Sequence, residues 1–183
     1  MNYDHKFKLI PSVYLLLIKD GKILLARRKN TGYEDGSYGL VAGHVDGEET
    51  FREAMQREAR EEAGLTLAPE NLQHALTMHR WCGDHERVDF FFTCSAWEGE
   101  PHIAEPHLCD DMRWFPLDAL PKNVIPYIRT AIAQQQEGKV LGGHLKDGCR
   151  VAVTAEVVIG IFDDIVYKRT LDVKTGFQEL SVA

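Results

Sequence analysis

The chain begins with two short apolar runs separated by a polar turn. Residues 13–18 and 23–26 are almost entirely hydrophobic, and Asp20-Gly21 lies between them. Two apolar runs joined across Asp-Gly are typical of a β-hairpin. The polar, glycine-containing residues 29–37 then predict a loop, and residues 38–42 predict a short strand.

The middle of the chain carries further strand and helix patterns. Residues 72–79, 88–96 and 112–115 predict strands. Residues 50–63 and 123–136 carry apolar side chains at helical spacing, which predicts two helices. Strands, a helix, more strands and a second helix are typical of an α/β fold in which helices cover a mixed β-sheet.

The C-terminal part of the chain follows a break at Gly138. Beyond it, residues 150–162 and 165–169 predict a pair of strands. We therefore expect one domain at residues 1–138 and an extension of β character at residues 139–183. Such strands would join the main sheet or pair through an exposed edge with a second copy, which makes a homodimer one expectation.

The helix predicted over residues 50–63 has signals at both ends. Thr50 and Glu53 have the spacing of a capping box, in which each side chain accepts a hydrogen bond from the other residue's backbone N–H. Gly64 follows at a position where a left-handed residue commonly ends a helix.

One face of this helix changes from apolar to acidic. Phe51, Ala54 and Met55 share a stripe that should face the core. Toward the C-terminal end, the same stripe continues with three glutamates: Glu58, Glu61 and Glu62. Like charges at i, i+4 repel, anions at a helix C-terminus oppose the helix dipole, and buried carboxylates lose hydration.

Two interpretations of this acidic stripe remain open at this point. A divalent cation bound through carboxylate oxygens would offset all three penalties. A solvated acidic face is the alternative, and Arg57 favours it in part because it can pair with Glu53 and Glu61. The helix already has a separate polar side, which is made of Arg52, Glu53, Gln56, Arg57 and Arg60.

Composition and charge exclude several classes of protein. The chain has 183 residues, of which 44% are hydrophobic and 27% charged, as is normal for a globular protein. Its apolar runs are far shorter than the ~18–20 residues of a membrane helix. A polar N-terminus without a signal-type apolar core makes the cytoplasm the expected location. The net charge of −7 disfavours general nucleic-acid binding.

The cysteines do not form an obvious disulfide or zinc pattern. They lie far apart in the sequence, as Cys82, Cys94, Cys109 and Cys149. An ordinary core without a secretion signal favours reduced thiols. His79 with Cys82, and His107 with Cys109, would be an alternative zinc pattern, but these spacings do not make a regular paired site.

The segment from Gly43 to Leu65 resembles the Nudix box, the signature of the Nudix hydrolase family. Its fixed positions read Gly43-x5-Glu49-x7-Arg57-Glu58-Ala59-Arg60-Glu61-Glu62-Ala63-Gly64-Leu65. Ala59 is smaller than the aliphatic residue that is usual at its position, and Val41-Ala42 replaces the common Pro-Gly before the box. The resemblance covers roughly residues 8–136.

The resemblance implies a Nudix-type α/β/α sandwich with a mixed β-sheet. It also implies hydrolysis of a nucleoside diphosphate linked to another group, with Mg²⁺ or Mn²⁺ as cofactor. By the same resemblance, four residues are metal ligands: Gly43 through its carbonyl, Glu58, Glu61 and Glu62. Glu58 and Glu61 are also candidate catalytic residues, and Glu58 would position or deprotonate the attacking water.

Three further residues of the box have implied roles. Arg57 is a candidate catalytic residue that orients the carboxylates by ion pairing. Glu49 would support the junction between loop and helix, and Gly64 is a structural position of the motif.

Residues outside the box resemble the MutT-type triphosphatases of the family. Residues 97–105 are similar to a segment whose last glutamate contributes to the catalytic metal site, so Glu105 is a further candidate ligand and catalytic residue. Arg28 matches a nucleotide-contacting position, and Asn123 lies one residue from a base-reading asparagine. A common turn for residues 97–105 and a helix cap for Asn123 are the alternatives. Trp81 and residues 90–92 are expected in the core, since aromatic strand residues usually fill sheets.

Three functions are compatible with these residues and with the resemblance. The leading hypothesis is Mg²⁺-dependent hydrolysis of a nucleoside triphosphate, with oxidised purines as candidates, to a monophosphate and pyrophosphate. The second is hydrolysis of a nucleotide sugar or another diphosphate. The third is a non-catalytic ligand-sensing domain, against which the intact glutamates of the box argue. The first two imply a small nucleotide as partner.

Overall fold

A computed structural model describes residues 7–82 and 85–145 of the chain. The predicted strands at 150–162 and 165–169 lie outside the described residues. Within the described part, no helix is long and apolar enough to cross a membrane.

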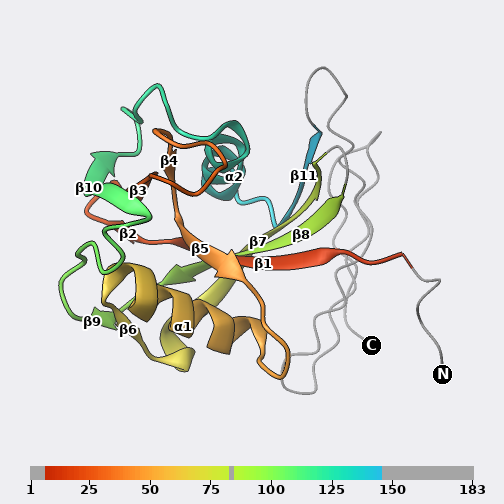
Figure 1. Ribbon diagram of the computed structural model, residues 1–183, viewed down its shortest axis with the longest axis horizontal. Helices are drawn as coiled ribbons and strands as arrows, with labels where there is room; N and C mark the ends of the chain where they lie inside the picture. Colours follow the sequence, from red (N-terminus) through yellow and green to blue (C-terminus); the bar gives the residue numbers. More distant parts are fainter. Residues whose placement is uncertain (1–6, 83–84, 146–183) are drawn as a thin grey trace.

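Within the described residues, the main sheet has five strands in the order β11-β7-β8-β1-β5 (Figure 1). Their bounds are Ile10–Leu16 (β1), Val41–His44 (β5), Leu72–Trp81 (β7), Glu86–Cys94 (β8) and Leu141–Leu145 (β11). The pairs β1–β8 and β11–β7 are parallel, whereas β1–β5 and β7–β8 are antiparallel. The sheet is therefore mixed, as the order of the predicted elements indicated.

Smaller sheets lie beside the main one. β10 (Cys109–Pro116), β3 (Lys22–Arg28) and β2 (Ile18–Lys19) pair in that order, and β4 (Tyr38–Gly39) also pairs with β3. A short sheet joins β6 (Thr66–Leu67) to β9 (Trp97–Glu98), and a 3₁₀ turn, η1, covers Pro69–Asn71.

Two helices cover opposite faces of the main sheet. Val13 and Leu15 of β1 share a buried cluster with α1 (Phe51–Ala63), whereas Tyr14 and Leu16 share another with α2 (Pro126–Gln136). Alternate residues of a strand point to opposite faces, so α1 and α2 lie on either side of the sheet (Figure 1). The fold is an α/β/α sandwich, as expected.

The predicted hairpin exists, but its first strand is shorter than expected. Asp20 and Gly21 both have positive φ, at 50° and 68°, as a tight hairpin turn requires. Only β2 pairs with β3 across this turn. The rest of the apolar run is β1, because a strand buried on both faces also reads as a continuous apolar run.

The predicted boundary between the domain and its extension, at residues 138 and 139, lies just before β11. This strand belongs to the predicted extension and pairs with β7 from Leu141↔Thr77 to Leu145↔Trp81. This part of the extension therefore adds a strand to the main sheet. The exact limits of the domain, and the homodimer, stay predictions.

Candidate active site

Helix α1 has the ends that the sequence predicts. The Thr50 hydroxyl accepts a hydrogen bond from Glu53 N at 3.2 Å, and the Glu53 carboxylate accepts one from Thr50 N at 2.7 Å. Gly64 ends the helix in the left-handed conformation, with φ 66°. A side chain there would also overlap the ring of His102.

The buried face of α1 differs in part from the predicted stripe. Four residues of the helix are fully buried: Ala54, Met55, Ala59 and Ala63. Phe51 is 39% exposed and stacks on Phe90 of β8. The Glu58 side chain is 13% exposed and that of Glu61 is 47% exposed. Small alanines let the helix approach the sheet closely, so Glu58 borders the buried face while Glu61 turns outward.

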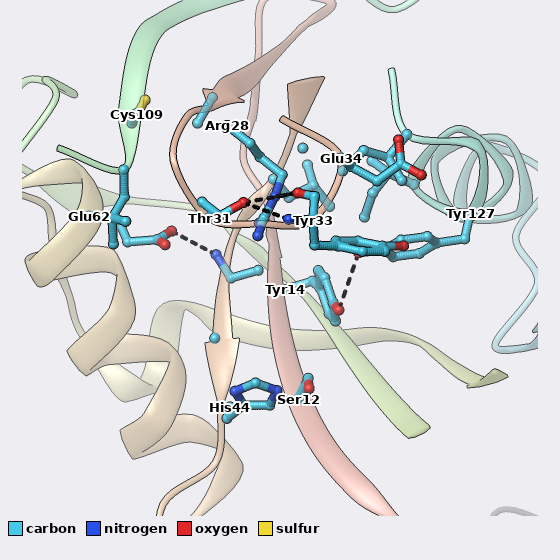
Figure 2. Close-up of a pocket in the computed structure, with 18 of the residues that line it drawn as sticks. Ser12, Tyr14, Arg28, Thr31, Tyr33, Glu34, His44, Glu62, Cys109 and Tyr127 are labelled. Carbon is cyan, nitrogen blue, oxygen red and sulfur yellow. Dashed lines mark hydrogen bonds between the residues drawn. The ribbon is translucent and has the colours of Figure 1, made fainter. Parts of the chain in front are cut away.

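Glu62 is the most enclosed carboxylate of the acidic stripe. Its side chain points from α1 toward β5 and accepts a hydrogen bond from Ala42 N at 2.9 Å (Figure 2). Burial raises its pKa to about 8, and the nearby charges of Glu58 and Glu105 act in the same direction. The charges of Glu58 and Glu105 are therefore close enough to Glu62 to disfavour its ionised form.

Glu58 lies directly against the backbone of β5. A Cβ atom on Gly43 would overlap the Glu58 carboxylate. Burial raises the pKa of Glu58, and Glu61 and Glu105 add to this effect, whereas Arg57 opposes it. The Gly43 backbone and the acidic face of α1 are therefore in immediate contact.

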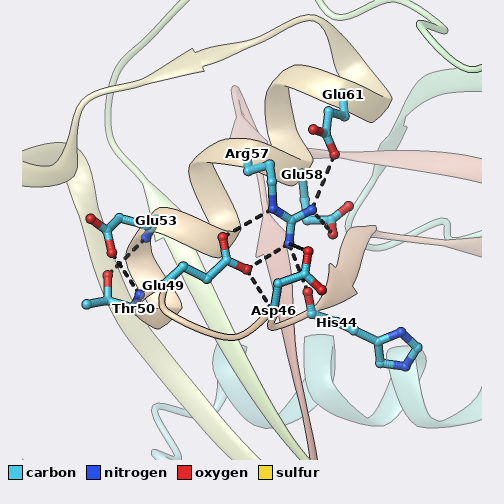
Figure 3. Close-up of polar contacts among 8 residues, drawn as sticks. All are labelled: His44, Asp46, Glu49, Thr50, Glu53, Arg57, Glu58 and Glu61. Carbon is cyan, nitrogen blue, oxygen red and sulfur yellow. Dashed lines mark hydrogen bonds and ion pairs between the residues drawn. The ribbon is translucent and has the colours of Figure 1, made fainter.

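Arg57 connects the carboxylates of this region (Figure 3). Its guanidinium donates to Glu49 from Nη2 at 2.8 Å and from Nε at 3.2 Å. It also donates to Glu58 at 2.6 Å, to Glu61 at 3.3 Å and to the His44 carbonyl at 3.0 Å. These partners, Glu49 above all, hold the pKa of Arg57 above its ordinary value.

Glu105 reaches this region through a segment attached to the end of α1. His102 N donates to the Ala63 carbonyl and Ala104 N to the Glu62 carbonyl, both at 3.1 Å. These carbonyls belong to the last turn of the helix and have no partner within it. The same bonds that satisfy them hold Glu105 beside the acidic stripe.

A cavity of about 1130 Å³ opens next to these carboxylates. Gly43, Glu62 and Glu105 are among its lining residues. Glu62 lies on one side of the close-up, and Ser12, Tyr14 and His44 line the cavity as well (Figure 2). Its size suits a nucleotide-sized ligand. Of the acidic stripe, Glu62 therefore borders the cavity, whereas Glu58 and Glu61 are not among its lining residues.

The carboxylates beside the cavity do not form a compact set of metal ligands in the described residues. Across residues 7–82 and 85–145, no three histidine, cysteine, aspartate or glutamate side chains form a metal-binding group. Arg57 holds Glu58, and Ala42 holds Glu62. Within these same ranges, neither of the two alternative zinc patterns forms such a group.

The NUDIX domain model matches residues 8–135 of the chain. The chain belongs to the Nudix family. The Nudix box thus spans β5, the following loop and α1, which are the elements that bring Gly43, Glu58 and Glu62 together.

Curated Nudix relatives include enzymes with different substrates. The chain is 29% identical over 118 residues to the NAD-capped RNA hydrolase NudC of Stutzerimonas stutzeri, covering 64% of this chain and 40% of that protein. It is 32% identical over 117 residues to an oxidized purine nucleoside triphosphate hydrolase of Danio rerio, covering 58% and 66%. The chain thus spans less than half the length of the NudC relatives.

Solved Nudix structures agree with the fold. A MutT NUDIX hydrolase from Burkholderia pseudomallei superposes with a TM-score of 0.64 at 29% identity, covering 69% of this chain and 98% of the other. A MutT protein from Methanosarcina mazei Go1 gives 0.63 at 21% identity, covering 72% and 96%.

The candidate substrate residues outside the Nudix box have different surroundings. Arg28 lines the cavity and donates from Nε to the Tyr33 carbonyl at 2.9 Å. Asn123 is not among the lining residues, and its amide nitrogen donates to the Gly36 carbonyl at 2.8 Å. It is not a helix cap either, because the N-cap of α2 is Ile125.

Several residues that line the cavity were not predicted from the sequence. Arg80 and Arg87 of the sheet and Tyr127 of α2 belong to this group. Trp81 is 42% exposed and lines the cavity, although it was expected in the core, whereas Phe91 is core as expected. The available signal for Arg80 was a charge at a position that shares its face of the strand with the apolar Leu76 and Met78.

Proposed function

We propose that the protein is a Mg²⁺-dependent Nudix hydrolase that cleaves a nucleoside triphosphate to a monophosphate and pyrophosphate. Oxidised purine triphosphates are the candidate substrates, and Mn²⁺ is the alternative cofactor. The observation that carries the proposal is the contact of Gly43 with Glu58 beside Glu62, at the wall of a nucleotide-sized cavity.

The chemistry of these residues fits a divalent cation. Nudix hydrolases generally use divalent metal ions, and Mg²⁺ prefers carboxylate and carbonyl oxygens. The raised pKa values of Glu58 and Glu62 indicate that their negative charges are poorly compensated. Glu58, Glu61, Glu62, Glu105 and the Gly43 carbonyl would hold the metal. Bound there, it would neutralise phosphate oxygens and orient the attacking water.

The residues of the chain have separate roles in this proposal. Glu58 accepts the proton of the attacking water. Arg57 binds Glu58 Oε1 and fixes the carboxylate, so Oε2 is the oxygen that accepts the proton. Glu49 holds Arg57 in turn. Arg28, which lines the same cavity, contacts the nucleotide, and Asn123, if it reads a base, must first release Gly36.

A dinucleotide with a pyrophosphate bridge is the second candidate substrate. The NudC relatives favour it, since their names state that they act on NAD-capped RNA. This candidate revises our expectation of no nucleic-acid partner, which rested on the net charge disfavouring general nucleic-acid binding, because a capped end requires only a local site. A nucleotide sugar and a non-catalytic sensing role are the remaining alternatives.

One substrate screen distinguishes these functions. The purified protein with Mg²⁺ is incubated with triphosphates, oxidised purine triphosphates, NAD and nucleotide sugars, and the products are identified. Release of pyrophosphate and a monophosphate supports the proposal. A preference for NAD or a nucleotide sugar would favour hydrolysis of that substrate over triphosphate hydrolysis. Binding without turnover of any of these substrates favours the sensing role.

A further inference from the structure

A row of polar side chains crosses the main sheet beside the cavity. In the strand register, His44 of β5 is opposite Ser12 of β1, and Ser12 is next to Asp89 of β8. Arg87 of β8 is opposite Arg80 of β7. This face of the sheet is otherwise apolar where α2 covers it. The row therefore runs from the residue after Gly43 across four strands.

Arg80 and Asp89 form the buried part of the row. Arg80 is 5% exposed and Asp89 is fully buried, and Arg80 Nε donates to Asp89 Oδ2 at 2.7 Å. Arg80 also donates to the Tyr14 hydroxyl at 3.3 Å and lies 3.8 Å from the centre of the Tyr127 ring. Removing two charges from water costs several kcal/mol per ion, so stability alone is a poor explanation for this pair.

Arg87 is the accessible member of the row and is only partly satisfied. Its side chain is 18% exposed and lines the cavity. Nη2 donates to Ser12 Oγ at 2.6 Å and lies 2.8 Å from His44 Nε2. Nε is 3.7 Å from Asp89 Oδ1, and both atoms are buried without a hydrogen-bond partner among the described residues. Such exceptions call for an explanation, since buried polar atoms are normally paired.

The charge of this wall is opposite to that of the acidic wall. Among the described residues, the guanidinium groups of Arg80 and Arg87 pair with one carboxylate, that of Asp89, which leaves one positive charge uncompensated within this part of the chain.

We propose that Arg87, held in place by Ser12, His44 and Asp89, is a subsite for the terminal phosphate of the substrate. This inference rests on the proposed function. Gly43, His44 and Arg87 line the same cavity, so the guanidinium that contacts His44 shares this cavity with the place assigned to the metal-bound diphosphate. A guanidinium recognises phosphate oxygens through paired N–H donors. The subsite favours triphosphates over nucleotide sugars, which carry a neutral sugar at that position.

Kinetics on two substrates tests the subsite. For Arg87→Gln, we expect KM for the preferred triphosphate to rise by about ten-fold or more, with a clearly smaller change in KM for a nucleotide sugar. Arg113→Gln is the control, because Arg113 is exposed, pairs with Asp111 and does not line the cavity. An equal change for both substrates, or none for the triphosphate, overturns the subsite.

Titration with inorganic pyrophosphate in the presence of Mg²⁺ separates this inference from the proposed function. We expect Arg87→Gln to weaken its binding by about ten-fold or more, and Arg87→Lys to weaken it less because one charge remains. Arg87→Lys also provides the test if Arg87→Gln does not fold. If Arg87→Gln loses pyrophosphate binding but the wild-type protein turns over none of the substrates, only the proposed function is refuted. Unchanged binding in both variants would refute the subsite, whatever the turnover.

Discussion

Arg57 binds Glu49 with two separate N–H donors, at 2.8 Å from Nη2 and 3.2 Å from Nε. Glu49 precedes α1, whereas Arg57 lies in its middle, so the pair joins the loop to the helix. The same guanidinium also reaches Glu58 and Glu61 (Figure 3). One arginine therefore couples the structure of the loop to the position of the acidic side chains.

Substitution of Arg57 by lysine should affect both stability and activity. Lysine keeps the charge but cannot make the forked contact with Glu49 while also holding Glu58. Because the contacts are partly exposed, we expect the free energy of unfolding to fall by about 1–2 kcal/mol. Turnover should fall by about ten-fold or more because Glu58 loses its orientation.

Urea unfolding and steady-state kinetics measure the two effects. Arg60→Lys on the same helix is the matched control, since Arg60 is exposed. Equal behaviour of the two lysine variants would show that Arg57 does not organise the site.

Substitution of Glu58 by glutamine tests the central catalytic assignment. We expect kcat to fall by about 10²–10⁴-fold, because glutamine can neither accept a proton nor hold a cation equally well. Stability should change little, since the variant removes repulsion from Glu61 and Glu105 along with the contact to Arg57. Glu70→Gln is the control at an exposed position. Turnover near the wild-type level in Glu58→Gln would remove the assignment.

Local signals in the sequence predicted the elements well. The ends of α1 follow from Thr50, Glu53 and Gly64, whose interactions are local and therefore visible in the sequence. The division of residues 13–18 between two sheets was not predictable in the same way. It depends on which distant strands pair with β1, and those contacts come from β5 and β8.

The candidate site was only partly predictable for the same reason. The motif identified Glu58 and Glu62, but helical spacing alone could not show that Glu61 is half exposed. The exposure depends on how closely the alanines of α1 approach the sheet. The Arg80–Asp89 pair joins two strands whose register the sequence does not reveal.

The stability of the metal-free protein should depend on pH through Glu62. Its pKa in the folded protein is about 8, against an ordinary value of 4.5. The folded state therefore keeps a proton that the unfolded chain releases between these values, and the contribution of Glu62 is lost as pH rises through this range. With a chelator present, we compare the melting temperature of wild type with that of Glu62→Gln. We expect the wild-type value minus the variant value to decrease as the pH rises from about 5 to about 8.

Thermal unfolding across this pH range, with and without Mg²⁺, measures the effect. Mg²⁺ should reduce the fall in wild type, because a bound cation stabilises the ionised carboxylate. The comparison with Glu62→Gln removes the contributions of histidines, which titrate in the same range. Parallel curves for the two proteins would contradict the assignment of Glu62 as a buried carboxyl group.

Two glycines of the Nudix box provide a matched test of the contact between β5 and α1. A Cβ atom on Gly43 would overlap the Glu58 carboxylate, whereas one on Gly47 meets no atom within 4 Å. Gly43→Ala should therefore displace Glu58, and a displacement of about 1 Å can lower turnover by about 10²-fold. Gly47→Ala should keep wild-type turnover. Because the Glu58 side chain can rotate away, Gly43→Ala should unfold at nearly the same urea concentration as wild type. Equal turnover of the two variants would mean that the contact does not position the catalytic glutamate.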